Sequence, residues 1–228
     1  MKKMNFNDSE RNSGTNFLTG ILRKNGFCVF EQQFQKNNSS LKFWKHGVPD
    51  KNIKLLVNRV IDIFIFRDLN DWLVSMFKNP WHLKPSKNFK DFLTNKQICV
   101  DLGEYDFYNK KLVNYEDEDK TIFEMRYNKI KKIYEYRENN PDIVFVNLTF
   151  LQNDEENVKI FIQTLSEKYL KVIKNNIITS IAHTKNNSNL KNRIYEIKID
   201  DYKKIVDTYK DENIENSINN LTFEIKEY

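Results

Sequence analysis

Near its N-terminus the chain reads SERNSGTNFL over residues 9–18. A short apolar–polar stretch, Met4 to Phe6, leads into this polar segment, and a helical pattern follows it. One face of that helix is marked by evenly spaced apolar residues, namely Phe17, Leu18, Ile21 and Leu22. The pattern therefore predicts a strand, a tight turn and a helix opened by Ser-Gly-Thr, with Gly26 as its stop signal.

A strand, tight turn and helix start form the geometry that binds phosphate. Gly14 lets a ligand approach the backbone closely, and Ser13 and Thr15 offer hydroxyl groups. The N–H groups of the first helical turn point at the same place, and the helix dipole favours a negative charge there by about 0.3–1 kcal/mol. The same residues also suit plain helix capping, so the distinction depends on the rest of the chain.

The composition favours a single folded domain, residues 1–228, with an anionic partner. Hydrophobic residues make up 39 % of the chain and aromatic residues 14 %, which is enough to build a core. A net charge of +5 suits a ligand that carries phosphate. The 32 acidic residues beside 37 basic ones make the surface mixed, so no nucleic-acid partner is expected.

The cysteines and the N-terminus indicate the compartment. Cys28 and Cys99 lie in apolar surroundings without the spacing of a metal site, so both are expected to be buried thiols. The polar N-terminus has no apolar signal core, and no apolar run reaches the roughly 18 residues of a membrane span. We expect a soluble, cytoplasmic protein with no membrane segment.

Strand-like and helix-like patterns alternate along the chain. Strands are expected at 27–30, 41–45, 60–66, 143–146, 177–182 and 195–199. Helices are expected at 68–77, 88–93, 120–137 and 153–172, with further helical turns after 200. The segment 105–118 has no clean periodicity, which indicates an insertion or lid around 84–119. The alternation predicts an α/β fold with a central, mostly parallel sheet flanked by helices.

Polar groups fall at the carboxyl ends of three of the expected strands. They are the Ser-Gly-Thr turn, His46 and Arg67. Ligands of open α/β sheets bind at that edge. Arg67 at the strand end and Ser75 in the following helix are placed to reach one phosphate, the guanidinium as a fork and the hydroxyl as a donor.

These segments resemble the P-loop sulfotransferase family. The resemblance rests on RNSGTNFL at 11–18, WKHGVP at 44–49, RDLNDWLVSM at 67–76 and PWH at 80–82, in the family's order. It covers roughly residues 9–83; beyond them only the alternation of elements fits. The resemblance implies a three-layer P-loop-type fold.

The resemblance also implies transfer of a sulfuryl group from 3′-phosphoadenosine 5′-phosphosulfate (PAPS) to a hydroxyl or amine of a glycan or small molecule. No metal is implied. The 5′-phosphosulfate would lie against residues that include Ser13, Gly14, Thr15 and Asn16. Arg67 and Ser75 would bind the 3′-phosphate, which distinguishes this donor from ATP. His46 matches the family's general base, and an imidazole pKa near 6.5 suits that role.

One departure from the family concerns the catalytic cation. Many members carry Lys immediately before Ser-Gly-Thr, whereas this chain has Asn12. Arg11 and Lys45 are the candidates to supply that charge, and Glu31, at another strand end, is a rival base. Lys185, Lys191 or Arg193 could serve as the family's C-terminal donor-binding cation, although a solvated loop is the better account of these residues.

Other functions stay open at this point. A P-loop kinase or nucleotide hydrolase is disfavoured because the chain has no Gly-x-x-x-x-Gly-Lys-Ser/Thr motif. A nucleic-acid-binding module draws support only from Tyr and Phe among basic residues, in a stretch that also reads as an ordinary amphipathic helix. An inactive, nucleotide-binding member of the sulfotransferase fold is a further alternative because of Asn12.

Overall fold

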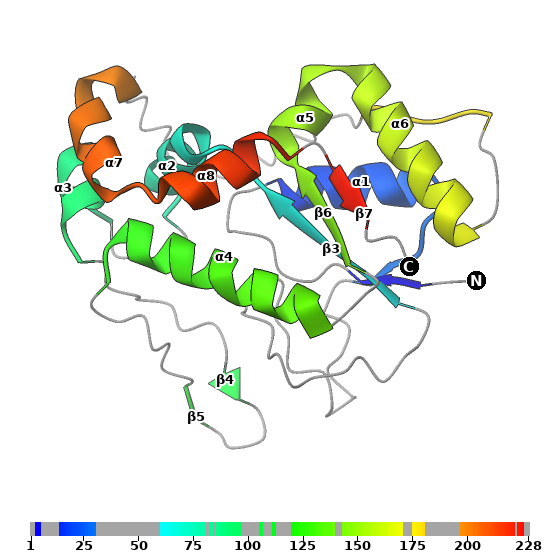
Figure 1. The fold of residues 1–228 in the computed structure, drawn as a ribbon, viewed down its shortest axis with the longest axis horizontal. Coiled ribbons are helices and arrows are strands. Elements are labelled where there is room, and N and C mark those ends of the chain that lie inside the picture. The colour runs from blue at the N-terminus through cyan, green and yellow to red at the C-terminus, as the bar shows by residue number, and fades with distance from the viewer. Residues whose placement is uncertain are drawn as a thin grey trace.

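A β-sheet with helices on both faces organises the computed structural model (Figure 1). It describes residues 3–5, 14–30, 60–80, 83, 85–96, 105–106, 111–112, 120–139, 143–170, 175–180, 197–221 and 223–225. The strands of this part are β1 (Lys3–Asn5), β2 (Val29–Phe30), β3 (Val60–Phe66), β4 (Tyr105–Asp106), β5 (Lys111–Leu112), β6 (Ile143–Asn147) and β7 (Phe223–Ile225).

The helices of the described residues cover the sheet and its carboxyl edge. They are α1 (Thr15–Lys24), α2 (Leu69–Lys78), α3 (Phe89–Thr94), α4 (Ile122–Asn139), α5 (Leu148–Asn153), α6 (Glu155–Leu165), α7 (Lys203–Tyr209) and α8 (Glu212–Asn219). A π-helical turn, η2 (Ser166–Leu170), extends α6, and a 3-10 turn, η3 (Ile199–Tyr202), precedes α7.

Within the described residues, five strands form one sheet in the order β2-β1-β3-β6-β7. β2, β1, β3 and β6 run parallel, and β7 pairs antiparallel with β6 at the edge. The predicted α/β class is confirmed. The sequence patterns missed β7, since three residues near the C-terminus are too few to show a period.

Buried residues of the two central strands alternate between two cores. Phe64, Phe66 and Phe145 pack with α2, α3, α4, α7 and α8 on one face. Ile63, Ile65, Val144 and Val146 pack with α1, α5 and α6 on the other. Successive side chains of a strand point to opposite faces, so a strand buried on both sides reads as a continuous apolar run. This explains why the run at 60–66 predicted β3 with its observed bounds.

Gly26 ends α1 as the sequence predicted. Its φ of 79° lies in the left-handed region. The N–H of Phe27 donates to the carbonyl of Leu22 at 3.0 Å, and the N–H of Gly26 donates to that of Arg23 at 2.9 Å. These two bonds form a Schellman motif, which satisfies carbonyls at the helix end and turns the chain toward β2.

The predicted strand at 177–182 is wrong over the described residues 177–180, which form no strand. The Asn25 side chain takes the place of a neighbouring strand there. Its Oδ1 accepts from the N–H of Ile178 at 2.9 Å, and its Nδ2 donates to the carbonyl of Ile178 at 2.8 Å. Because a buried side chain satisfies this backbone, apolar character alone did not decide its conformation.

The helix expected at 153–172 is confirmed over its described part. Asp154 caps α6 by accepting from the N–H of Glu156 at 2.9 Å, and the π-helical turn η2 continues the helix to Leu170. Two further expectations need correction. The strand expected at 195–199 is absent from its described part, where Ile199 opens a 3-10 turn. Cys28 is exposed, not buried. Cys99 and the strand expected at 41–45 lie outside the described residues.

The segment expected to form an insertion or lid around 84–119 is described in part. Its α3 inserts Phe89, Phe92 and Leu93 into the core with α2 and α4, while β4 and β5 pair as a separate antiparallel ribbon. The single-domain organisation and the lid stay predictions. None of the helices in the described part of the chain is long and apolar enough to cross a membrane.

Candidate functional site

The carboxyl ends of β1 and β3 mark a switch point in the sheet. The two strands are neighbours, but the chain leaves β1 toward β2 on one side and β3 toward β6 on the other. Their helices pack on opposite faces, α1 in one core and α2 in the other. Open α/β sheets bind ligands in the crevice at such a point. Gly14, which precedes α1, and Arg67, which precedes α2, flank it.

α1 begins with an N-terminus that suits an anion. Gly14 is its N-cap, and the first helical bond joins the N–H of Leu18 to the Gly14 carbonyl at 3.0 Å. The N–H groups of the preceding helical residues therefore have no carbonyl partner within the helix. No acidic residue lies in this first turn, whereas Arg23 and Lys24 lie in the last. Thr15 is half-buried and Asn16 is exposed.

Gly14 is also required by packing. Its φ is 91°, and a Cβ at this position would lie 2.6 Å from Cδ1 of Leu148. Leu148 is buried at the start of α5, directly after Asn147 at the carboxyl end of β6. The glycine thus brings the start of α1 close to a third strand end, and it has a structural reason to be glycine whether or not a ligand binds.

Arg67 lies just before α2, and Ser75 lies within it. The Arg67 side chain is 25 % exposed, and its Nη2 lies 4.0 Å from Oδ2 of Asp71. Asp71 and Ser75 are four residues apart, so they share one face of the helix. The ion pair therefore places the Arg67 guanidinium on the face of α2 that carries Ser75. Because Asp71 is 62 % exposed and the distance is long, the pair is weak.

Asn147 ties the ends of β3 and β6 together. Its Nδ2 donates to Oδ1 of Asp68 at 3.0 Å and to the carbonyl of Ile218 in α8 at 2.9 Å. Its Oδ1 accepts from the N–H of Thr149 at 2.8 Å and so caps α5. The start of α1 is thereby linked to Arg67: Gly14 approaches Leu148, the neighbouring Asn147 bonds Asp68, and Asp68 follows Arg67 in the chain.

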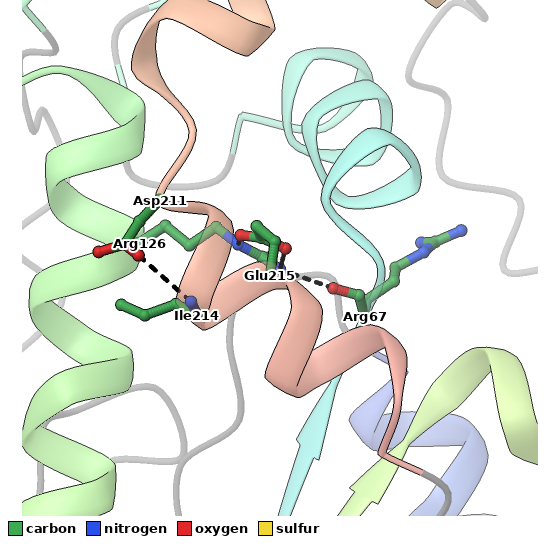
Figure 2. Close-up of polar contacts among 5 residues, drawn as sticks. All are labelled: Arg67, Arg126, Asp211, Ile214 and Glu215. Carbon is green, nitrogen blue, oxygen red and sulfur yellow. Dashed lines mark hydrogen bonds and ion pairs between the residues drawn. The ribbon is translucent and has the colours of Figure 1, made fainter.

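A buried ion pair lies beside Arg67 (Figure 2). Arg126 of α4 donates from Nε to Oε1 of Glu215 at 2.8 Å and from Nη2 to Oε2 at 3.0 Å. Nη2 also donates to the Arg67 carbonyl at 2.8 Å. The Arg67 side chain extends away from this pair in Figure 2.

Tyr127, adjacent to Arg126 on α4, has a buried hydroxyl that makes no hydrogen bond to the described residues. Burial, and then the nearby Glu215 carboxylate, raise the pKa of this phenol well above its ordinary value. The hydroxyl therefore stays protonated throughout the ordinary pH range, and it adds no charge beside the Arg126–Glu215 pair.

A cavity of about 560 Å³ opens between the start of α2 and the helices α7 and α8. The carboxylates on its wall outnumber the lysines: Asp68, Asp71, Asp200, Asp207 and Glu215 against Lys203 and Lys210. An excess of negative charge disfavours a phosphate ligand. The lining therefore does not suit the predicted anion, although Asp71, the ion-pair partner of Arg67, lies on the cavity wall. Among the described residues, no group of three or more His, Cys, Asp or Glu side chains is arranged to hold a metal ion.

The predicted site residues divide into two groups. Gly14, Thr15, Asn16, Arg67 and Ser75 are described, and topology brings the start of α1 and Arg67 to one edge of the sheet, while Ser75 lies further along α2. The others lie outside the described residues: Arg11, Asn12, Ser13, Glu31, Lys45 and His46.

The sequence patterns missed Arg126, Glu215 and Asn147. A signal existed for two of them. Arg126 lies four residues from both Ile122 and Ile130, on the apolar face of its helix, and Asn147 directly follows an apolar strand. Comparison with known proteins adds nothing to this geometry: no family model matches the chain, and neither curated proteins nor solved structures give a match.

Proposed function

We propose that this chain is a PAPS-dependent sulfotransferase with a P-loop-type fold that acts in the cytoplasm. The observation that carries the proposal is the pairing of β1 and β3, which brings the Gly14 helix start and Arg67 to one switch point. The resemblance of residues 9–83 to the sulfotransferase family supplies the chemistry. The acceptor is proposed to be a glycan or a small molecule.

The described residues fit a donor with two separate phosphate groups. The uncapped N–H groups of α1 suit the 5′-phosphosulfate, since oriented amides and the helix dipole both favour an anion. Arg67 suits the 3′-phosphate, because its guanidinium is partly exposed and its ion pair with Asp71 is weak enough for a phosphate to replace. Ser75 would add a hydroxyl from the same face of α2.

The donor supplies the sulfuryl group. A bond forms between the acceptor oxygen and sulfur, while the bond between sulfur and the phosphate oxygen breaks and 3′,5′-bisphosphoadenosine leaves. His46 takes the acceptor proton in this proposal, with Glu31 as the alternative base. Arg11 or Lys45 supplies the positive charge that Asn12 lacks.

A thermal-shift experiment tests the proposal without knowledge of the acceptor. A ligand specific for the folded state stabilises it by about 2.7 kcal/mol at a hundredfold excess over Kd. Since each kcal/mol raises Tm by about 2–4 °C for a chain of this size, 3′,5′-bisphosphoadenosine with a chelator should raise Tm by roughly 5–10 °C. ATP should do much less. A larger shift with Mg-ATP would indicate a kinase, and a salt-sensitive shift with oligonucleotides alone would indicate a nucleic-acid-binding module.

Arg67→Ala tests the 3′-phosphate directly. The variant should lose about 1.5–3 kcal/mol of affinity for 3′,5′-bisphosphoadenosine, the range of a charge-assisted hydrogen bond, and little for adenosine 5′-phosphate. Lys78→Ala is the matched control, because it removes an exposed positive charge from the other end of α2. An equal loss for both nucleotides in Arg67→Ala, measured by titration calorimetry, would contradict a role in binding the 3′-phosphate.

A further inference from the structure

The buried pair of Arg126 and Glu215 is unusual in its surroundings. Their side chains are 0 % and 3 % exposed, and they join helices α4 and α8 across 89 residues of sequence. Removing two charges from water costs several kcal/mol for each ion, so a well-packed apolar pair of similar volume is often as stable or more stable. Stability alone therefore gives no reason for an ion pair at this position, and its further contacts become informative.

Those contacts converge on the junction between β3 and α2. The last paired residue of β3 is Phe66, so the Arg67 carbonyl lies just beyond the sheet ladder with β6. Arg126 supplies its hydrogen bond at 2.8 Å. The same guanidinium lies 4.8 Å from the centre of the Trp72 ring, at the end of the first turn of α2. Arg126 thus contacts the chain on both sides of the point where α2 begins.

Glu215 fixes the orientation of that guanidinium. It accepts from Nε and Nη2, so the planar group cannot rotate without breaking one bond of a bidentate pair. Glu215 is itself placed by α8, whose first turn is capped by the Asp211 side chain accepting from the N–H of Ile214 at 3.2 Å. Asn147 holds the next residue, Asp68, and the same helix through Ile218. The Arg67 carbonyl is thereby held from α4 and the Asp68 side chain from the end of β6, and α8 orients both Arg126 and Asn147.

We propose that Arg126 and Glu215 are positioning residues for Arg67. By holding the Arg67 carbonyl on the buried side, they direct its side chain to the opposite, partly exposed side, as Figure 2 shows. The inference rests on the proposed function, because it assigns to this pair the preorganisation of the 3′-phosphate site. A preorganised guanidinium binds more tightly, since less ordering remains to be done when the ligand arrives.

The test replaces the pair by apolar residues of similar size. The double variant Arg126→Met with Glu215→Leu should keep a melting temperature near or above that of the wild type. Its preference for 3′,5′-bisphosphoadenosine over adenosine 5′-phosphate, the ratio of the two Kd values, should fall roughly threefold to tenfold, the range of one neutral hydrogen bond. A merely structural pair would change Tm but leave this ratio unchanged.

Two more variants complete the design. Tyr136→Phe is the control, because it removes a buried hydrogen bond between α4 and β3, that of its hydroxyl to Asp62 at 2.9 Å, away from Arg67. It should lower Tm and leave the ratio unchanged. If the double variant does not fold, Glu215→Gln provides the test, because the amide keeps the carboxylate's shape but weakens its hold on Arg126. It should reduce the ratio in the same direction.

The outcomes separate the two proposals. A wild-type protein that binds both nucleotides equally overturns the proposed function, and this inference with it. A wild type with a clear preference that a folded double variant retains overturns the positioning role alone. Arg126→Lys should resemble the double variant in its Kd ratio, since a point charge cannot satisfy Glu215 and the Arg67 carbonyl with the geometry of a planar fork.

Discussion

Gly14→Ala tests the geometry of the α1 start through two costs that the structure separates. An L-residue at a φ of 91° is disfavoured by about 1–2 kcal/mol relative to glycine. The added Cβ would also lie 2.6 and 2.7 Å from the two Cδ atoms of Leu148, so this buried side chain must move, at about 1–3 kcal/mol for overpacking. The free energy of unfolding should fall by about 2–5 kcal/mol, and Tm by an amount on the order of 5–20 °C.

A double-mutant cycle measured by urea titration isolates the second cost. Leu148→Ala alone should destabilise the protein by about 2–5 kcal/mol, because it opens a cavity in the core. In the Gly14→Ala background it should cost about 1–3 kcal/mol less, since the shortened side chain leaves room for the new Cβ. Additive effects, within about 0.5 kcal/mol, would refute the close approach of α1 to α5.

The matched control for Gly14→Ala is Gly20→Ala, in the middle of α1. Gly20 has no positive φ, so alanine should stabilise the helix by about 0.5–1 kcal/mol. A loss at both positions would mean that α1 tolerates no added methyl group, and it would contradict a special role for the Gly14 backbone.

Three other perturbations have defined outcomes. Hydrogen bonds from the Thr121 N–H, and then from its hydroxyl, lower the pKa of the Glu124 carboxyl below its ordinary 4.5. The ionised carboxylate therefore contributes its full stabilisation above pH 4.5, and this contribution is lost as the pH falls through the lower pKa of the folded state. The stability difference between wild type and Glu124→Gln should therefore be small, because Glu124 is exposed, and should narrow in thermal melts as the pH falls below 4.5. Tyr127→Phe should leave Tm unchanged or raise it, because it removes a buried hydroxyl that has no partner among the described residues, whereas Tyr136→Phe should lower it. Asn25→Ala should cost about 1–3 kcal/mol and speed hydrogen exchange at the Ile178 amide, and unchanged exchange would contradict the role of Asn25 there.

The candidate site was predictable where short segments carry it. Gly14 and Arg67 lie at or just before helix starts, whose residue types reveal their geometry within a few positions, and Ser75 lies in the helix that follows Arg67. The residues that hold them were not predictable in the same way. Arg126 and Glu215 are 89 residues apart, and each alone reads as a surface charge on a helix. Arg126 lies among apolar positions of α4, which was the one local indication of its burial.

The sequence by itself determined the α/β alternation, the bounds of β3 and the end of α1 at Gly26, because a pattern of residue types within a few positions marks each of them. Tertiary structure decided which of these elements are neighbours and which weak patterns fail. In the tertiary structure β1 pairs with β3, and the backbone of Ile178 makes hydrogen bonds with the Asn25 side chain instead of with a neighbouring strand. The physical reason is that a buried backbone or charged group takes whatever partner the packed chain brings to it, however distant that partner is in sequence.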